Sequence, residues 1–332
     1  MIFCIKKAKK DKYVYVIRWD MKKRSEVLSE LVNNKFCEGD EEFVDSKFYN
    51  CSTSITREHF DIVNQAQSNF YKKEIGQYEI LSIPDPLLID SDDEGIIISE
   101  LCKIFGCLLG RITSKSKVLV VGLGNRHISA DSLGTAICKK INITLKNKYL
   151  PQIMAICPSV MGLTGIETYE IVRGVIDRIK PTHLILIDSL CAGDESRLCK
   201  SIQITDTGVC PGSGIGNKRK CIDKSLAPVV VSIGVPLLIY SSTFIDGQLN
   251  KYNINQARIT SIMQRLKKVD NNETFINLLD DMKSLIKCDN FNTIVTVKDI
   301  EESVEILSNI IAKSINISLN VSELKKTYNH KI

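Results

Sequence analysis

The sequence predicts an α/β protein built around a mainly parallel β-sheet. Short apolar runs, such as residues 118–121 and 183–187, have the β-branched and aliphatic composition of strands buried on both faces. Between such runs, apolar residues recur at helical spacing, as they do over 171–179. Strands that alternate with helices in this way form parallel sheets with right-handed crossovers. With 332 residues and 44% apolar content, the chain is long enough to bury a substantial core.

The remaining elements follow from the same periodicities. The first 75 residues are polar and weakly patterned, which predicts a peripheral arm with one helix near 22–32. Thr164 and Glu167 are spaced as a capping box at the start of the 171–179 helix. The other expected elements are a strand at 78–83, a helix at 96–109, a helix over 133–141, strands at 153–157 and 228–233, a strand over 183–187 that ends in Asp188, and a C-terminal helix over 300–315.

Composition excludes several classes of protein. The net charge of +5 is far from the concentrated basic surface of a nucleic-acid-binding protein. The N-terminus has no apolar signal segment, and the longest apolar stretch, 229–240, is interrupted by Gly234 and Pro236 and is too short to cross a bilayer. The 12 cysteines form no CxxC pair. We therefore expect a soluble cytoplasmic protein with reduced thiols and no membrane or direct nucleic-acid partner.

The segment 117–134 is the most informative about function. A buried strand is followed by Gly122 and Gly124, which allow a sharp turn, and then by a polar loop that leads to Asp131. Open α/β sheets bind ligands and carry out chemistry at the carboxyl ends of their parallel strands. The third glycine of a dinucleotide-binding fingerprint is replaced by His127, so this turn does not predict nucleotide binding.

Asp188 is a candidate partner for Asp131, because both follow parallel strands. If the strands are neighbours, the two carboxylates enter one crevice, where one pKa rises and the pair can work as acid and base. Asp131 in the first turn of a helix would favour its charged form, so Asp188 would hold the proton. Two alternatives stay open. Asp131 could be a helix-capping residue and Asp188 a turn residue, neither with a catalytic role, or the two could belong to a metal site that includes His127. His183 lies on the opposite strand face from Asp188 and is expected to be a packing residue.

A glycine-rich basic segment spans residues 205–220. Gly212, Gly214 and Gly216 alternate before a run of three cations, a pattern that can form a backbone anion nest. It lacks the spacing of a Walker A loop. The segment would hold an extended acidic peptide beside the aspartates, or it would be a solvated turn.

These segments together resemble the germination protease family of spore-forming bacteria. The motifs that carry the resemblance are Gly122-Leu-Gly-Asn, Asp131-Ser-Leu-Gly, Val160-Met-Gly-Leu-Thr-Gly-Ile-Glu-Thr, Ile187-Asp-Ser-Leu, Ile202-Gln-Ile-Thr-Asp-Thr-Gly, Pro211-Gly-Ser-Gly-Ile-Gly-Asn-Lys-Arg-Lys and Ile233-Gly-Val-Pro, in the family's order.

The resemblance implies a homotetrameric endopeptidase that degrades small acid-soluble spore proteins in the spore core. It implies a three-layer, phosphorylase/hydrolase-like fold related to hydrogenase-maturation peptidases, and no cofactor. Asp131 and Asp188 match the two essential aspartates. The residues expected to bind substrate are Gly212, Gly214, Gly216, Asn217, Lys218 and Arg219, and those expected to shape the site are Gly122, Gly124, Asn125 and Glu167.

The resemblance also sets the expected domain limits and shows departures. Residues 1–22 are a possible propeptide, followed by one peptidase domain over 23–332, with its core at 76–240 and a C-terminal helical segment at 298–318. Only Arg18 and Asp20 of the family's processing motif are kept, so the sequence does not establish cleavage there. Three further family positions differ, at Ala130, Cys210 and Tyr240. Both aspartates are present, which favours an active protease over a non-catalytic relative that binds acidic spore proteins or an anion; a metal-dependent peptidase is the third possibility.

Overall fold

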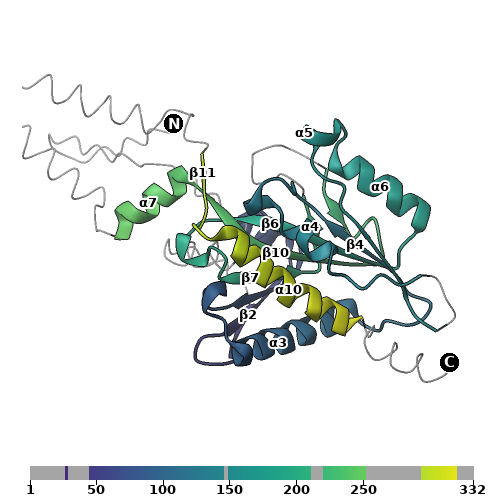
Figure 1. The fold of residues 1–332 in the computed structure, drawn as a ribbon, viewed down its shortest axis with the longest axis horizontal. Coiled ribbons are helices and arrows are strands. Elements are labelled where there is room, and N and C mark those ends of the chain that lie inside the picture. Colours follow the sequence, from purple (N-terminus) through teal and green to yellow (C-terminus); the bar gives the residue numbers. More distant parts are fainter. Residues whose placement is uncertain (1–26, 29–44, 146–148, 211–219, 252–292, 320–332) are drawn as a thin grey trace, which may run out of the picture. The chain divides into compact units, whose positions relative to one another are not determined.

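The computed structural model describes residues 27–28, 45–145, 149–210, 220–251 and 293–319 (Figure 1). The chain divides into a larger unit, residues 25–239 with 296–332, and a smaller one, residues 1–24 with 240–295. The smaller unit contains helix α7 (Ser241–Lys251) and the short strand β11 (Ile294–Val295). The expected helix near 22–32, apart from Val27 and Leu28, the possible propeptide and most of the glycine-rich segment lie outside the described residues.

A mixed β-sheet runs through the larger unit in the order β1-β2-β3-β7-β10-β6-β4-β5. Strands β10, β6, β4 and β5 are parallel to one another, as the alternation of strands and helices predicts. The other strands are joined by antiparallel pairing. A separate two-stranded ribbon consists of β8 and β9. The bounds are β1 (Asp45–Asn50), β2 (Thr56–Ile62), β3 (Gly76–Ser82), β4 (Lys117–Gly122), β5 (Gln152–Ile156), β6 (His183–Ala192), β7 (Ser201–Thr205), β8 (Gly208–Val209), β9 (Ile222–Asp223) and β10 (Val229–Tyr240).

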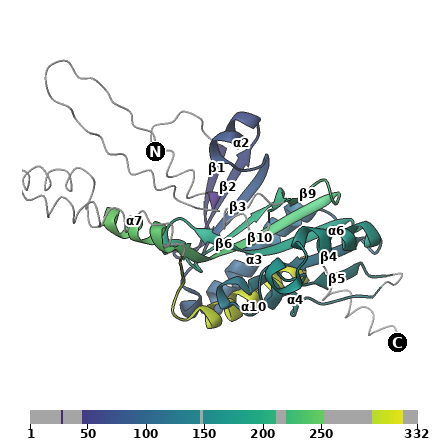
Figure 2. The same ribbon diagram turned by 90° about the horizontal axis from the view of Figure 1, so that it is seen from above.

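Helices cover both faces of this sheet (Figure 2). Helices α3, α4 and α10 bury their apolar sides against one face, where Val118, Val120 and Ile185 point. Helix α6 covers the other face, through Val172 and Ile176. The three-layer α/β prediction is therefore confirmed. The helices are α2 (Gln65–Tyr71), α3 (Ser91–Leu109), α4 (Leu133–Cys138), α5 (Met161–Thr164), α6 (Thr168–Ile179) and α10 (Ile300–Ser318), with 3₁₀ turns η1 (Pro86–Leu88), η2 (Ser129–Asp131) and η3 (Glu195–Arg197).

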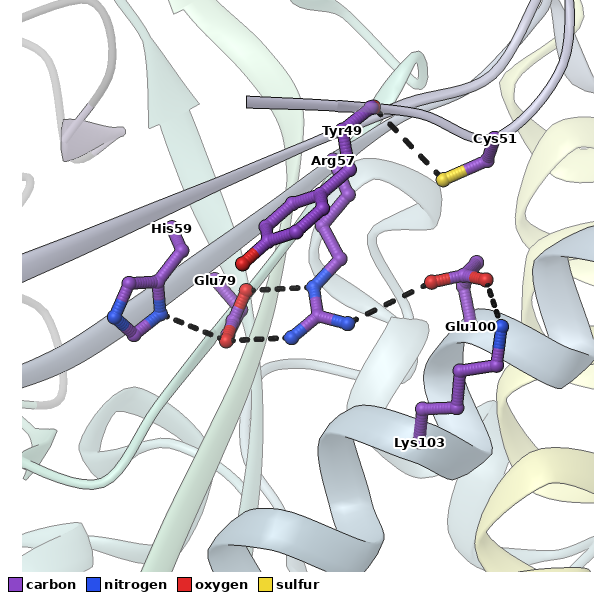
Figure 3. A network of polar contacts seen from close by, with 7 residues as sticks. All are labelled: Tyr49, Cys51, Arg57, His59, Glu79, Glu100 and Lys103. Atoms are coloured by element: carbon purple, nitrogen blue, oxygen red, sulfur yellow. Dashed lines mark hydrogen bonds and ion pairs between the residues drawn. The ribbon is translucent and has the colours of Figure 1, made fainter. Parts of the chain in front are cut away.

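The expected peripheral arm is wrong for residues 45–71, which form β1, β2 and α2. Charged residues of β2 are paired across the sheet rather than solvated, as Figure 3 shows. Arg57 donates two hydrogen bonds of 2.8 Å to Glu79 on β3, and His59 Nδ1 bonds the same carboxylate at 2.9 Å. Arg57 also lies 3.6 Å from Glu100 on α3. Strand β2 was therefore not predicted, because its polar side chains are paired with charged residues on β3 and α3 and give no apolar pattern.

Two local predictions are also corrected. Strand β6 does not end at Asp188 but continues to Ala192, since β10 pairs with it along that length. The capping box does not form: Thr164 Oγ1 donates to the Ile166 carbonyl at 3.0 Å, and the Glu167 side chain makes no capping bond to α6. Helix α5 ends at Thr164, which directs this side chain to its own turn instead. Among the described residues, no helix is long and apolar enough to span a membrane.

Candidate active site

The turn after β4 brings Gly124 against Asp131. The Leu123 N–H donates to the Ile187 carbonyl at 2.8 Å, which extends the contact between β4 and β6 by one residue. Gly124 then adopts a φ of +97°, a conformation that side chains rarely allow. A Cβ at Gly124 would also clash with the Asp131 carbonyl and lie 2.7 Å from Asp131 Oδ1. Glycine is therefore needed here for the close approach of Asp131.

Asp131 is held by the main chain of the same loop. Its Oδ2 accepts a hydrogen bond of 2.8 Å from the Asn125 N–H. Burial raises the pKa of Asp131, and the bond from Asn125 offsets this only in part. Asp131 ends the 3₁₀ turn η2, one residue before Ser132, the N-cap of α4, so it precedes the α-helix instead of lying in its first turn.

Asp188 lies on the neighbouring strand β6. It directly follows Ile187, whose carbonyl bonds Leu123, and its Oδ1 accepts a hydrogen bond of 2.9 Å from the Ser189 N–H. Gly234 is its partner on β10. Asp188 thus lies within β6, directly after the residue that bonds Leu123, and Asp131 lies in the loop that follows β4.

A pocket of about 450 Å³ opens over Asp188. Strand β6 contributes Leu186 and Leu190 beside it, β7 contributes Gln203, and β10 contributes Ser232. The described residues that line the pocket include Asp188 but not Asp131. The sequence predicted that both carboxylates enter one crevice, but among the described residues only Asp188 of the two lines this pocket.

Sequence reasoning missed polar residues of this pocket. Ser232 is 7% exposed, and its Oγ has no hydrogen-bond partner among the described residues. It stands within the apolar run of β10, so the sequence predicts it only as a strand residue. Lys72, Lys73 and Lys224 also line the pocket, from segments distant in sequence. Their common position depends on strand pairing that no local motif reveals.

Cys210 and Cys221 at the pocket form a disulfide, contrary to the expectation of reduced thiols. Val209 on β8 pairs with Ile222 on β9, so the next residues along the ribbon face each other with their Cα atoms 4.0 Å apart. The bond links Cys210, within the glycine-rich segment, to Cys221, the residue directly after that segment. The predicted substrate-binding residues Gly212, Gly214, Gly216, Asn217, Lys218 and Arg219 lie outside the described residues.

The other candidates have mainly local roles. Gly122 packs beneath α4, where a Cβ would lie 2.5 Å from the Gly134 carbonyl carbon. Glu167 is the N-cap residue of α6. His183 is buried, which lowers its pKa, and its Nδ1 bonds Thr182 at 2.7 Å, as expected of a packing residue. His127, the suggested additional metal ligand, contacts Arg126 at 3.2 Å, and the described part of the chain contains no group of three His, Cys, Asp or Glu residues suited to a metal.

The fold and the site define a class of α/β protein with one carboxylate on a parallel strand and a second in the loop after the neighbouring parallel strand. The model of the germination protease family matches residues 44–256. A germination protease of Clostridium acetobutylicum is 35% identical over 81% of this chain and 87% of its own length. Others are those of Clostridium tetani, 33% identical over 78% and 83%, and Bacillus licheniformis, 33% identical over 66% and 71%. The chain belongs to the germination protease family and is a peptidase, which confirms the resemblance.

A solved structure also shows similarity. The [NiFe] hydrogenase maturation protease HycI from Thermococcus kodakarensis KOD1 matches 40% of this chain and 80% of its own, with 18% identity and a TM-score of 0.30.

Proposed function

We propose that this peptidase is an endopeptidase that starts the degradation of small acid-soluble spore proteins during spore germination. The observation that carries the proposal is the position of Asp188 in a pocket of about 450 Å³, one strand away from the loop that holds Asp131. Membership of the germination protease family supports both the reaction and the substrate class.

In the proposed mechanism, the two aspartates divide acid and base roles. Burial raises the pKa of Asp131, which favours the protonated form of this carboxyl. We therefore assign the proton to Asp131 rather than to Asp188, the reverse of the sequence-based assignment. Asp188 acts as the base that activates water for attack on the peptide carbonyl, and Asp131 protonates the leaving amine.

Three lysines of the pocket can contact an acidic substrate. Lys72, Lys73 and Lys224 line it beside Glu74, Asp188 and Asp223, and the whole chain carries a net charge of +5. A net positive protein attracts an acidic chain and speeds its encounter. The basic run Lys218–Lys220, which directly precedes Cys221 in the sequence, adds to this attraction in the proposal. The family relationship further supports a homotetramer, made as a zymogen in the cytoplasm of the developing spore.

The test is cleavage of a purified small acid-soluble spore protein, followed by mass spectrometry. Wild-type protein, both full length and trimmed to begin near residue 23, should give discrete fragments. Asp131→Asn and Asp188→Asn should give none while keeping the wild-type circular dichroism spectrum. Asp177→Asn, on the exposed face of α6, is the matched control and should cleave normally.

Other outcomes would assign the chain differently. Binding of the spore protein without cleavage by either wild-type form would contradict the proposal and favour the non-catalytic relative. Cleavage that a chelator abolishes and a divalent ion restores would contradict the two-aspartate mechanism and favour a metal-dependent peptidase.

A further inference from the structure

Two thiols lie side by side near the loop of Asp131, at the ends of different elements. Cys138 is the last residue of α4 and is buried, whereas Cys157 directly follows β5 and is exposed. The Cys138 thiol donates a hydrogen bond of 3.7 Å to the carbonyl oxygen of Ile156, the residue directly before Cys157. Both residues are free cysteines in the structure.

The surroundings of the two thiols differ in a way that separates their reactivity. The neighbouring Cys138 thiol lowers the pKa of Cys157 to about 7, and the cations Lys139 and Arg126 lower it further. The interaction with Cys157 and burial raise the pKa of Cys138. Cys157 therefore forms the thiolate, which reacts with oxidants, more readily than Cys138, and it is also the exposed member of the pair.

We propose that Cys138 and Cys157 form a peroxide-sensitive dithiol, in which Cys157 is oxidised first and Cys138 closes a disulfide between α4 and β5. The Cys157 thiolate attacks the peroxide O–O bond of a hydroperoxide, which gives a sulfenic acid and releases an alcohol or water. The Cys138 sulfur then displaces the sulfenic oxygen as water. The two thiols together supply the two electrons that reduce the peroxide.

A change at Cys138 is transmitted to the candidate active site through α4. The helix begins two residues after Asp131, and Gly134 packs so closely on Leu123 that a Cβ there would lie 2.5 Å from the Leu123 carbonyl oxygen. At the other end, a Cβ at Gly122 would lie 2.8 Å from Cys138 Sγ. A disulfide would bring the two sulfurs to about 2.05 Å of each other and link the end of α4 to the residue after β5. This link constrains α4 beside Asp131, and we expect a several-fold loss of peptidase activity that reduction restores; this consequence rests on the proposed function.

The full-length protein tests the dithiol directly. It is treated with one equivalent of hydrogen peroxide, its remaining thiols are alkylated, and its peptides are mapped with and without reduction. We expect a Cys138–Cys157 cross-linked peptide that disappears on reduction. Cys138→Ser should stop at a sulfenic acid on Cys157 that dimedone traps. Cys107→Ser, which removes another exposed cysteine, should form the cross-link as the wild type does.

The proposal is overturned if Cys157 is alkylated equally before and after peroxide treatment, or if it joins a different cysteine. Cross-linking with unchanged cleavage of the spore protein would contradict the link to Asp131 while leaving the dithiol in place. A protein that cross-links but never cleaves in its reduced form would contradict the proposed function and not the dithiol, because the peptide map does not depend on activity.

Discussion

Replacing Arg57 with methionine should destabilise the fold by about 3 kcal/mol, because breaking a buried ion pair leaves an uncompensated buried charge. The Glu79 side chain is 6% exposed and that of Arg57 16%, and two hydrogen bonds of 2.8 Å join them. His59 would remain bonded to Glu79, which places the expected loss at the lower end of the range for such pairs. Methionine keeps the apolar stem of the side chain, so the loss reports mainly on the charge.

The assay is urea unfolding followed by far-ultraviolet circular dichroism, with the free energy of unfolding obtained by linear extrapolation. Lys313→Met is the matched control. Its ion pair with Glu94 is 2.9 Å long, but the two side chains are 59% and 40% exposed, so its loss should change stability by less than about 1 kcal/mol. Equal losses in the two variants would refute the reasoning.

A double variant tests the physical cause. Arg57→Met combined with Glu79→Leu removes both members of the pair, while Glu100 keeps its ion pair with Lys103 and His59 keeps its hydrogen bond to Asp61. Its stability should recover most of what the single variant loses, because apolar residues can replace a buried ion pair with little loss. A double variant less stable than Arg57→Met would show that the loss of stability comes mainly from losing the ion pair itself, and not from leaving Glu79 unpaired.

Three further changes concern the histidine of this network, the glycine beside Asp131 and the pocket. Burial alone would lower the pKa of His59, but hydrogen bonds to two carboxylates raise it overall. Protonated His59 therefore stabilises the folded protein fully below the ordinary pKa of 6.5, and this contribution is lost as the pH rises through the raised pKa. The stability difference between wild type and His59→Gln, from urea titrations over a pH series, should therefore shrink as the pH rises. Gly124→Ala should lower kcat/KM by about 10²-fold through displacement of Asp131, whereas Gly174→Ala, which meets no described atom within 4 Å, should cleave normally. Ser232→Ala should raise KM for the spore protein and leave the melting temperature unchanged, because its hydroxyl has no partner among the described residues. A stability difference that stays constant with pH would contradict the expectation for His59. Equal activities of the two glycine variants would contradict that for Gly124, and a lower melting temperature with unchanged KM would contradict that for Ser232.

The sequence predicted the parallel part of the sheet well, because strands buried on both faces are marked by continuous apolar runs. Strands β4 and β6 are continuous apolar runs, and the stripe over 300–315 became α10, which lies along α3 (Figure 1). It did not predict β2, because charged residues of this strand are stabilised by partners distant in sequence, such as Glu79 for Arg57. Local periodicity carries no information about such pairing.

The candidate site was predicted in part. Gly124 and Asp131 follow from a local strand–turn–acid pattern, and the structure brings them into close contact. The environment of Asp131 was not predictable, since the raised pKa depends on tertiary burial, which the local sequence pattern does not specify. The disulfide between Cys210 and Cys221 also depends on an antiparallel ribbon that the spacing of the cysteines does not reveal.

The most direct test of the central claim is the ratio of kcat/KM for cleavage of a small acid-soluble spore protein by wild type and by Asp188→Asn, with unfolding curves as the folding control. Loss of a general base predicts a decrease of at least about 10²-fold with an unchanged unfolding midpoint. Near-wild-type cleavage by the folded Asp188→Asn protein would contradict the two-aspartate account.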